Sequence, residues 1–546
     1  MLALLVVALG PLIAAGIVHG KPMLTGGDHV SAGVRIEVHA ADRLAQVNDL
    51  IGSVVNEHYW MPGDPVHPDW YDRFLGRTIT AVRDLAPANG RKVAVRFGHT
   101  PTDGPWGRDG YHWQAAFDPS AWATSIDEFM EYIERVGGEP HVAVNFGSGT
   151  AREAAEFVAY VNGTDPNNPS VQLRQQRGRA EPWGVVHWII GFEQYAQWET
   201  GHRGDREFDY ANPEAKHGGD PDWYGKPAIN VQDYTARAAE FARQMRAASP
   251  TPIQITAPGN NWDLGYWNGP EASMRALATG LGDSVDGIAF HFYPANAPYG
   301  ETDADLLGRP ETFSDFIDRA EILWAQYAPR GKKLHVADVE FNNNSSSNEQ
   351  THQLVNALFV TDTLRVLAEK GVGSAFYFAI SAAEGNGSGF TFFEKGDVRN
   401  LMPSYRALQL VARHLGTDVV RSDVFRGRLT TATGGRLGSF DYPTLTSLAS
   451  LAPDRQTLYL VVVNKHLTLE QTAEIVIDGA RPGGEARFTV LTGTSPAATS
   501  ADVWLEESRQ PVGGLLSGPV TRTFPPYSVT AIAIPLASPV PPFTRG

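Results

Sequence analysis

Two apolar runs that end in a carboxylate stand out in the hydrophobic pattern of this chain. Residues 185–190 read VVHWII, a nearly continuous apolar stretch typical of a parallel strand covered on both faces, and Glu193 follows shortly after it. Residues 334–339 form a second such stretch, which ends in Glu340. At the carboxyl end of a barrel strand a lone Glu is a candidate acid or nucleophile, and an ion-paired structural role fits its position about equally well. Two strands of this kind favour a facing pair of carboxylates.

Six further apolar stretches have the length of strands, and helical patterns separate them. They are residues 49–60, 93–97, 141–146, 253–257, 285–292 and 374–380. One intervening helix is well marked, because Thr150 and Glu153 form a capping-box pattern and an apolar stripe at helical spacing runs from there to Gly163. Eight strands that alternate with helices predict an α/β fold, a (β/α)8 TIM barrel over residues 41–417.

The pattern changes after the barrel. Residues 418–536 read as short alternating strands punctuated by Gly and Pro, which predicts a C-terminal β-sandwich. Residues 32–40 precede the barrel and also alternate, so we expect this N-terminal strand to join the sandwich. The Pro-rich segment 537–546 is expected to form a poorly ordered tail.

The first twenty residues are apolar, but Gly10, Pro11 and Gly16 interrupt them and they are short for a membrane span. They favour a signal peptide over residues 1–20, with an uncleaved N-terminal anchor as the alternative, because the expected basic start is missing. A secreted or periplasmic protein is therefore predicted, with membrane tethering as the alternative.

Composition narrows the chemistry that is possible. The chain has 546 residues and a formal net charge of -16, which argues against nucleic acid or an anionic membrane as its partner. It contains no cysteine, which excludes disulfides, thiolate metal sites and Cys nucleophiles. Any nucleophile must be of another type, and no obligate membrane contact is expected beyond the possible anchor.

The loops after the second and fifth predicted strands are rich in aromatic residues. They carry Trp106, Tyr111, Trp113, Trp262, Tyr266 and Trp267. Aromatic rings with a polar edge suit sugar rings, which present CH faces and a rim of hydroxyls. Each ring taken alone fits ordinary loop packing better, but the cluster favours a carbohydrate-binding cleft.

Two carboxylates on opposite walls of such a cleft can divide the work of cleaving a glycosidic bond. One protonates the departing oxygen while the other attacks the anomeric carbon, provided that the two stand about 5 to 5.5 Å apart. Arg96 and Tyr293 end predicted strands and could keep the nucleophile ionised, although Arg96 fits a structural counterion equally well. His291 is either a packing residue of the core or a residue that orients the nucleophile and the sugar ring.

Several stretches resemble one enzyme family. EPHVAVNFGSGTAREAAEFVAYVNG at 139–163 is the most specific match, and FHFY, DVEFN and LMPSYRALQLVARH are also similar. The resemblance is to glycoside hydrolase family 51, the α-L-arabinofuranosidases of the clan A retaining glycosidases. It implies a (β/α)8 barrel plus a β-sandwich, a retaining mechanism and no cofactor.

The resemblance also assigns roles to single residues. It implies that Glu193 is the general acid/base, that Glu340 is the nucleophile, that Glu57 binds a sugar hydroxyl and that Tyr293 contacts the sugar ring. The matching stretch adds Asn145 to the candidate substrate-binding residues.

Two places depart from the family pattern: position 192, and the loop after Arg96, which reads FGHTPTDGPWG where the family has a compact Pro-Gly-Gly turn. The family reads Gly-Asn-Glu at the acid/base, whereas this chain has Phe192 in place of the Asn. The amide that normally bonds the sugar 2-hydroxyl is therefore missing. This predicts poor hydrolysis of standard arabinofuranosides and a better substrate that turns an apolar face to Phe192.

The predicted function is hydrolysis of an oligo- or polysaccharide by a retaining α-L-arabinofuranosidase. The alternatives in the same clan are another furanosidase, a β-xylosidase, a β-glucuronidase, an endo-xylanase or an endo-glucanase. An inactive carbohydrate-binding protein on the same fold is the alternative from a different class, and retention of both Glu193 and Glu340 favours the enzyme.

Overall fold

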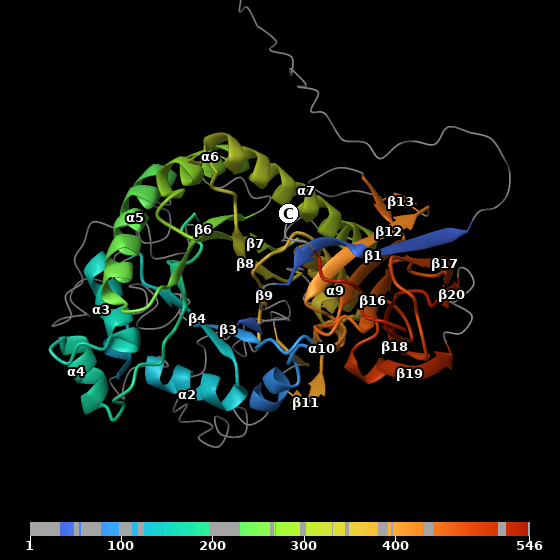
Figure 1. The fold of residues 1–546 in the computed structure, drawn as a ribbon, viewed down its shortest axis with the longest axis horizontal. Helices are drawn as coiled ribbons and strands as arrows, with labels where there is room; N and C mark the ends of the chain where they lie inside the picture. Colours follow the sequence, from blue (N-terminus) through green and yellow to red (C-terminus); the bar gives the residue numbers. More distant parts are fainter. Residues whose placement is uncertain are drawn as a thin grey trace, which may run out of the picture. The chain divides into compact units, whose positions relative to one another are not determined.

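The computed structural model describes most of the chain from Gly33 onwards (Figure 1). The described residues are 33–47, 54–55, 78–97, 112–117, 125–147, 149–195, 230–261, 267, 269–294, 302–329, 331–343, 349–380, 391–394, 397–426, 428–430, 440–511 and 520–543. No helix in these ranges is long and apolar enough to cross a membrane. The predicted signal peptide or anchor at 1–20 lies outside them, so export stays a prediction.

Eight parallel strands close into a barrel, which confirms the predicted fold class. In chain order they are β2 (Val54–Val55), β3 (Ala94–Phe97), β4 (Glu139–Val144), β5 (His187–Ile190), β6 (Gln254–Asn261), β7 (Gly287–Phe292), β8 (Val336–Phe341) and β9 (Ser374–Tyr377). Each strand pairs with the next, and Val54 of β2 pairs with Tyr377 of β9 to close the ring. Because all strands run in one direction, their carboxyl ends meet at one mouth.

Helices alternate with the barrel strands, as expected. They are α2 (Ile126–Val136), α3 (Ala151–Asn162), α4 (Pro169–Gln176), α5 (Val231–Ala248), α6 (Pro270–Leu281), α7 (Asp303–Tyr327), α8 (Glu349–His352), α9 (Leu354–Glu369) and α10 (Pro403–Arg413). Helix α3 begins after Thr150, whose side chain accepts a hydrogen bond from the backbone of Glu153, so this half of the predicted capping box is formed. The Glu153 carboxylate bonds His112 instead, because a buried imidazole needs a partner.

Most of the C-terminal strands join one nine-stranded sheet, and a single apolar core contains residues from both ends of its strand order, such as Phe488 and Phe524, in line with the predicted C-terminal β domain. Its order is β19 (Val503–Pro511), β18 (Glu485–Gly493), β21 (Ser528–Pro535), β16 (Thr457–Asn464), β15 (Leu445–Leu451), β12 (Asp418–Phe425), β1 (Val34–Gln46), β17 (Gln471–Asp478) and β20 (Val520–Phe524). The predicted N-terminal strand is confirmed, because β1 pairs antiparallel with β12 and parallel with β17. Its alternation places Ile36, Val38 and Ala40 in the apolar core of the sheet.

The end of the described chain packs against this sheet. Val540 is buried, and Arg455 donates a hydrogen bond to the carbonyl of Pro541 at 2.8 Å. The guanidinium of Arg455 also lies 4.7 Å from the centre of the Phe543 ring. The expectation of a loose tail is therefore wrong as far as Phe543, because the Pro-rich segment contributes apolar side chains that the sheet can cover.

A buried ionic cluster joins the barrel to the sheet. Asp362 of α9 and Lys465, which follows β16, are fully buried and their charged atoms lie 2.9 Å apart. The hydroxyl of Thr446 and the guanidinium of Arg365 also donate to the Asp362 carboxylate, each at 2.6 Å. Burial alone would raise the pKa of Asp362, but the Arg365 guanidinium and the Lys465 ammonium hold this pKa well below its usual range.

Replacing Lys465 tests this connection. Lys465→Met should lower the free energy of unfolding by about 3 to 5 kcal/mol, because removing one partner of a buried ion pair leaves a charge without full compensation. Lys92→Met is the matched control, since Lys92 pairs with Glu139 on the surface and its loss should cost about 0.2 to 1 kcal/mol. Denaturant unfolding of the two variants measures both values. Equal losses of unfolding free energy in the two variants would show that the ionic cluster does not stabilise the contact between the barrel and the C-terminal sheet.

Candidate active site

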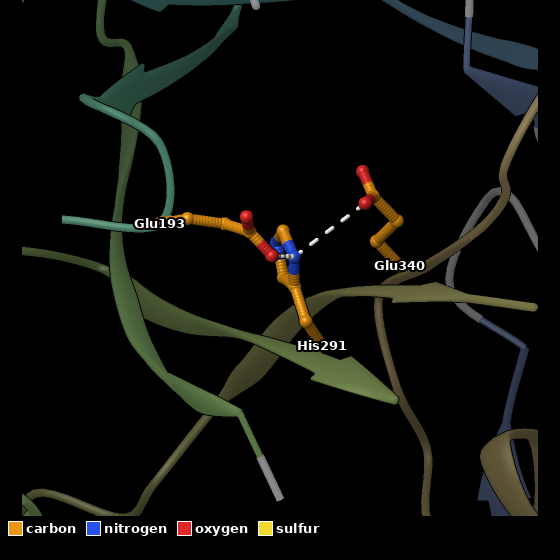
Figure 2. A group of neighbouring side chains, drawn as sticks. All are labelled: Glu193, His291 and Glu340. Atoms are coloured by element: carbon orange, nitrogen blue, oxygen red, sulfur yellow. Dashed lines mark hydrogen bonds and ion pairs between the residues drawn. The ribbon is translucent and has the colours of Figure 1, made fainter. Parts of the chain in front are cut away.

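The two predicted carboxylates meet at the mouth of the barrel (Figure 2). Glu193 follows β5, Glu340 lies in β8, and His291 of β7 points towards both. Each of the three offers one ligand atom, and these atoms all lie within 4.8 Å of one another. Glu193 is 8% exposed and Glu340 is 3% exposed, so both carboxylates are largely shielded from water.

The backbone around Glu193 is unusual in a way that the residue types explain. Glu193 has a φ of 44°, in the left-handed region that non-glycine residues rarely adopt. Gly191 has a φ of 78°, and a Cβ there would come within 2.8 Å of the Phe146 Cβ. Glycine at 191 therefore permits the sharp turn that brings the next carboxylate to the mouth. Strain of this kind costs about 1 to 3 kcal/mol and tends to gather at functional sites.

Glu340 is held by two donors. Arg96 of β3 donates from Nη2 to its Oε2, and the hydroxyl of Tyr293, just after β7, donates to its Oε1. The sequence predicted both residues as donors to one glutamate, and in the structure both bond Glu340. The role of Glu340 as the nucleophile stays a prediction. Hydrogen bonds and a positive charge favour the ionised carboxylate, which is the form a nucleophile needs.

Glu193 has a different set of partners. His291 Nδ1 lies 2.7 Å from its Oε1, and the hydroxyl of Tyr195 donates to the same oxygen at 2.9 Å. Burial lowers the pKa of His291, an effect that the charge of Glu193 opposes. A neutral imidazole therefore faces Glu193, and its Nδ1 is also 3.5 Å from Glu340 Oε1. Glu340 is bonded by a guanidinium and a phenol, whereas the bonds described for Glu193 involve an imidazole and a phenol.

Phe192 packs against one residue that bonds Glu340 and one residue that bonds Glu193. The Arg96 guanidinium carbon lies 4.3 Å from the centre of the Phe192 ring and 5.2 Å from that of Phe376. The Phe192 ring also meets His291 edge to face, with ring centres 4.9 Å apart. Phe192 and Phe376 are both buried. The Phe192 ring thus contacts Arg96 and His291, and a contact with the substrate stays a prediction.

A second polar layer lies on the same strands. Asp338 precedes Glu340 by two residues on β8, and its Oδ1 is 3.4 Å from Nδ1 of His141. The rings of His141 and His187 stack with centres 4.1 Å apart. Burial would raise the pKa of Asp338, but His141, His187 and Arg96 lower it, so Asp338 is ionised. Burial and the neighbouring His141 lower the pKa of His187 to about 3, so this imidazole is neutral.

The remaining candidates are less closely tied to the glutamates. Asn145 follows β4, and its amide nitrogen lies 3.4 Å from Nε2 of His112. The other nitrogen of His112 is 2.8 Å from Glu153. Asn145 is only partly buried, and its role in substrate binding stays a prediction. Glu57 lies outside the described residues.

The predicted aromatic lining is only partly described. Trp113 is 1% exposed and stacks on Phe157 of α3 with ring centres 5.4 Å apart, so it belongs to the core between barrel and helices. Trp267 is also buried and packs against Tyr195 and Tyr234. Ordinary packing was the correct interpretation for these two residues. Trp106, Tyr111, Trp262 and Tyr266 lie outside the described residues.

Three residues at the site were missed by the sequence reasoning. Tyr195 lies two positions after Glu193, and Asp338 lies two positions before Glu340 on the same face of its strand. That spacing of two was the available signal for Asp338. Phe376 gave no local signal, because its place beside Arg96 depends on the pairing of β8 with β9, in which Glu340 lies opposite Phe376.

Glu193, His291 and Glu340 also have the composition of a metal site. Both oxygens of Glu340 are, however, already engaged by Arg96 and Tyr293. A divalent cation at this point would also be repelled by the Arg96 guanidinium. The arrangement therefore fits a pair of reacting carboxylates better than it fits a set of metal ligands.

Comparison with known proteins points to the same chemistry. The family model described as the α-L-arabinofuranosidase 1 domain matches residues 93–303. The chain is 24% identical over 550 residues to α-L-arabinofuranosidase C of Emericella nidulans, which covers 91% of this chain and 96% of that protein. It is 26% identical over 329 residues to an intracellular exo-α-(1→5)-L-arabinofuranosidase of Halalkalibacterium halodurans, which covers 56% of each chain.

Solved structures share the fold along nearly the whole chain. The arabinose complex of the Thermotoga maritima α-L-arabinofuranosidase superposes with a TM-score of 0.68 at 22% identity, over 92% of this chain and 100% of that one. The family 51 α-L-arabinofuranosidase of Thermotoga petrophila gives a TM-score of 0.67 at 23% identity, with the same coverage. The matches in sequence and fold, together with a facing pair of glutamates, confirm the predicted resemblance to the α-L-arabinofuranosidases of glycoside hydrolase family 51.

Proposed function

We propose that this protein is a retaining α-L-arabinofuranosidase that uses Glu340 as nucleophile and Glu193 as acid/base. The separation of the two glutamates carries the proposal. Their carboxylate oxygens approach within 4.8 Å, close to the roughly 5 to 5.5 Å of retaining glycosidases. Inverting enzymes need about 6.5 to 9.5 Å, because a water molecule must fit between the second carboxylate and the sugar.

The two carboxylates can take different roles because their partners differ. Glu340, held by Arg96 and Tyr293, is kept ionised and attacks the anomeric carbon, so that a bond forms to its carboxylate oxygen. At the same time Glu193 gives its proton to the departing glycosidic oxygen. In the second step Glu193 takes a proton from water, which attacks the same carbon and releases Glu340 as a free carboxylate.

The identity of the sugar rests on the relatives. The proteins named above that match most of the chain are α-L-arabinofuranosidases, which supports arabinofuranose as the sugar cleaved here. A structure with lower similarity, titled a bifunctional glucanase-xylanase, superposes with a TM-score of 0.59 at 13% identity. It keeps an endo-acting glucanase or xylanase as the alternative, which release of oligosaccharides from xylan or from a β-glucan would reveal.

The function is tested first by a panel of 4-nitrophenyl glycosides. Phe192 led the sequence to predict poor hydrolysis of standard arabinofuranosides, but the relatives favour this sugar. We therefore expect the highest kcat/KM with α-L-arabinofuranoside among arabinofuranoside, xyloside, glucuronide and glucoside. Glu340→Ala should abolish turnover while the far-ultraviolet spectrum stays native, and azide should restore part of the rate by attacking from the vacated side. A higher kcat/KM on another glycoside would assign that sugar as the substrate instead. Near-native rates in Glu340→Ala would overturn the mechanism.

A second experiment concerns Glu193. In Glu193→Ala, substrates with basic leaving groups should lose roughly 100-fold to 10,000-fold in rate, because a leaving oxygen of this kind must be protonated as it departs. Activated aryl glycosides should lose far less in the glycosylation step. Pre-steady-state rates on a nitrophenyl substrate and on an alkyl arabinofuranoside supply the comparison. Equal losses on both would rule out Glu193 as the acid.

A third experiment uses the dependence of the rate on pH. We place the proton of the neutral His291 imidazole on Nδ1, because the Glu193 carboxylate oxygen is 2.7 Å from that nitrogen. In this tautomer the ring donates to Glu193 and favours the ionised form of its carboxylate. In His291→Phe the donor is lost, Glu193 keeps its proton to higher pH, and the basic limb of the kcat/KM profile should move upwards. His291→Asn can place an amide N–H near the Nδ1 position and should stay close to the native profile. A basic limb unchanged in both variants would show that His291 does not act on Glu193.

A further inference from the structure

Helix α10 packs against β18 and β21 of the C-terminal sheet, and its end borders a cavity of about 560 Å³ (Figure 1). Small-ligand sites usually have volumes of roughly 300 to 1,000 Å³. The lining includes three arginines, which are Arg413 at the end of α10, Arg487 on β18 and Arg509 on β19. Tyr459 of β16 and His414 also line the cavity. Cations and aromatic rings thus gather here in a protein whose net charge is -16.

The strand register places the two sheet arginines side by side. Arg487 lies directly opposite Arg509 in the pairing of β18 with β19. Ala533 and Tyr459 continue the same row across β21 and β16. Like charges directly opposite each other destabilise a sheet. Protection of the sheet edge explains a charge on the edge strand β19 but not Arg487, because β18 pairs with strands on both sides. The packing of the described sheet therefore does not account for this pair.

The arginines are poorly compensated by acidic side chains. In the part of the chain that the structure describes, Arg413 and Arg487 form no ion pair, and Glu507, which also lines the cavity, forms none either. Arg509 pairs with the exposed Glu485 at a distance of 3.9 Å. Arg413 lies at the carboxyl end of α10, where the helix dipole alone favours a cation, but no such dipole acts on the two arginines of the sheet. Their planar guanidinium groups match the geometry of a carboxylate.

The aromatic side of the cavity matches a sugar ring. The half-buried rings of His414 and Tyr459 meet edge to face with centres 5.9 Å apart. We place the His414 proton on Nδ1, because the Leu410 carbonyl oxygen, 2.8 Å away, can only accept. Burial lowers the pKa of His414, so the imidazole is neutral and its Nε2 is an acceptor. Aromatic face, acceptor and cations together complement the CH face, hydroxyls and carboxylate of a sugar acid.

The cavity lies away from the catalytic mouth. The backbone N–H of Ala88, which precedes β3, donates to the carbonyl of Ala412 near the end of α10 at 2.8 Å. The end of α10 is therefore beside the amino ends of the barrel strands. Glu193 and Glu340 lie at the carboxyl ends of their strands. A ligand in the cavity thus leaves the catalytic mouth free.

We propose that this cavity is a second carbohydrate site, which binds a uronic acid unit of a polysaccharide through Arg487, Arg509 and Tyr459. The two guanidinium groups bind the sugar carboxylate, and the Tyr459 ring covers a CH face of the sugar. The choice of a sugar acid among anions rests on the proposed function, because a glycosidase meets acidic sugars as part of its polysaccharide. Binding at a second site keeps the enzyme on the polysaccharide and raises the effective concentration of the bonds it cleaves.

Affinity electrophoresis tests the site without turnover. Native gels contain either glucuronoxylan or the same xylan after its carboxyl groups have been reduced to alcohols. Retardation of the protein in each gel gives a Kd. We expect the native protein to bind glucuronoxylan roughly tenfold or more tightly than the reduced xylan, because charge-assisted hydrogen bonds are lost on reduction. Arg487→Gln and Arg509→Gln should each weaken binding of glucuronoxylan roughly tenfold and leave binding of the reduced xylan unchanged.

Two further variants separate the charge of the cavity from general effects. Arg421→Gln removes the same charge from β12 of the same sheet, where Arg421 pairs with Asp42 outside the cavity, and should bind both xylans like the native protein. Tyr459→Leu removes the ring and should weaken binding of both xylans. In Arg487→Gln, kcat/KM on the aryl glycoside that the native enzyme cleaves fastest should stay unchanged, because the cavity is remote from both glutamates.

Three results would overturn the proposal. They are equal binding of the two xylans by the native protein, native affinity for glucuronoxylan in Arg487→Gln, and binding of oligodeoxythymidylate as tight as that of glucuronoxylan, which would show a site for anions in general. The readout is retention in a gel, so it is separate from the glycoside panel. An inactive protein with the expected retention would refute the proposed function and support the second site, and an active enzyme without it would do the reverse.

Discussion

The proposed mechanism depends on keeping two buried carboxylates side by side in opposite ionisation states. Like charges within 4.8 Å in a shielded pocket repel one another strongly, so a symmetric pair would tend to share one proton at random. The protein removes this symmetry through the partners it supplies. Glu340 receives a cation and a phenol, whereas Glu193 receives a neutral imidazole and a phenol.

Closure of the barrel supplies those partners. Arg96, Glu193, His291 and Glu340 come from four different strands or strand ends, and they meet because parallel strands all end at one mouth. No pair of them is close in sequence, so no local segment could assemble the site alone. The ionic cluster of Asp362 and Lys465 ties α9 of the same barrel to the C-terminal sheet, which links the two parts of the structure.

The sequence predicted what depends on local pattern. Strand positions followed from apolar runs, and Glu193, Glu340, Arg96 and Tyr293 were found because each lies at or near the end of such a run. Neighbours that depend on strand register, such as Phe376, could not be found in this way. For Trp113 the interpretation of the ring taken alone was correct and membership of a sugar-binding cluster was not, because a ring that packs against α3 and a ring that faces a sugar have the same local sequence pattern.

The place of β1 has a consequence for how the chain acquires its structure during synthesis. Its ladder partners, β12 and β17, both follow the entire barrel in sequence, so β1 leaves the ribosome long before either partner exists. Until then its apolar positions, Ile36 and Val38, have no sheet core to enter, and its backbone has two unpaired edges. This strand stays unpaired until the C-terminal strands have been synthesised. Pairing between strands so distant in sequence is slow, and the unpaired strand can meanwhile associate with other chains. The barrel and the sheet are therefore one unit in biogenesis, since neither end of the chain completes its sheet without the other.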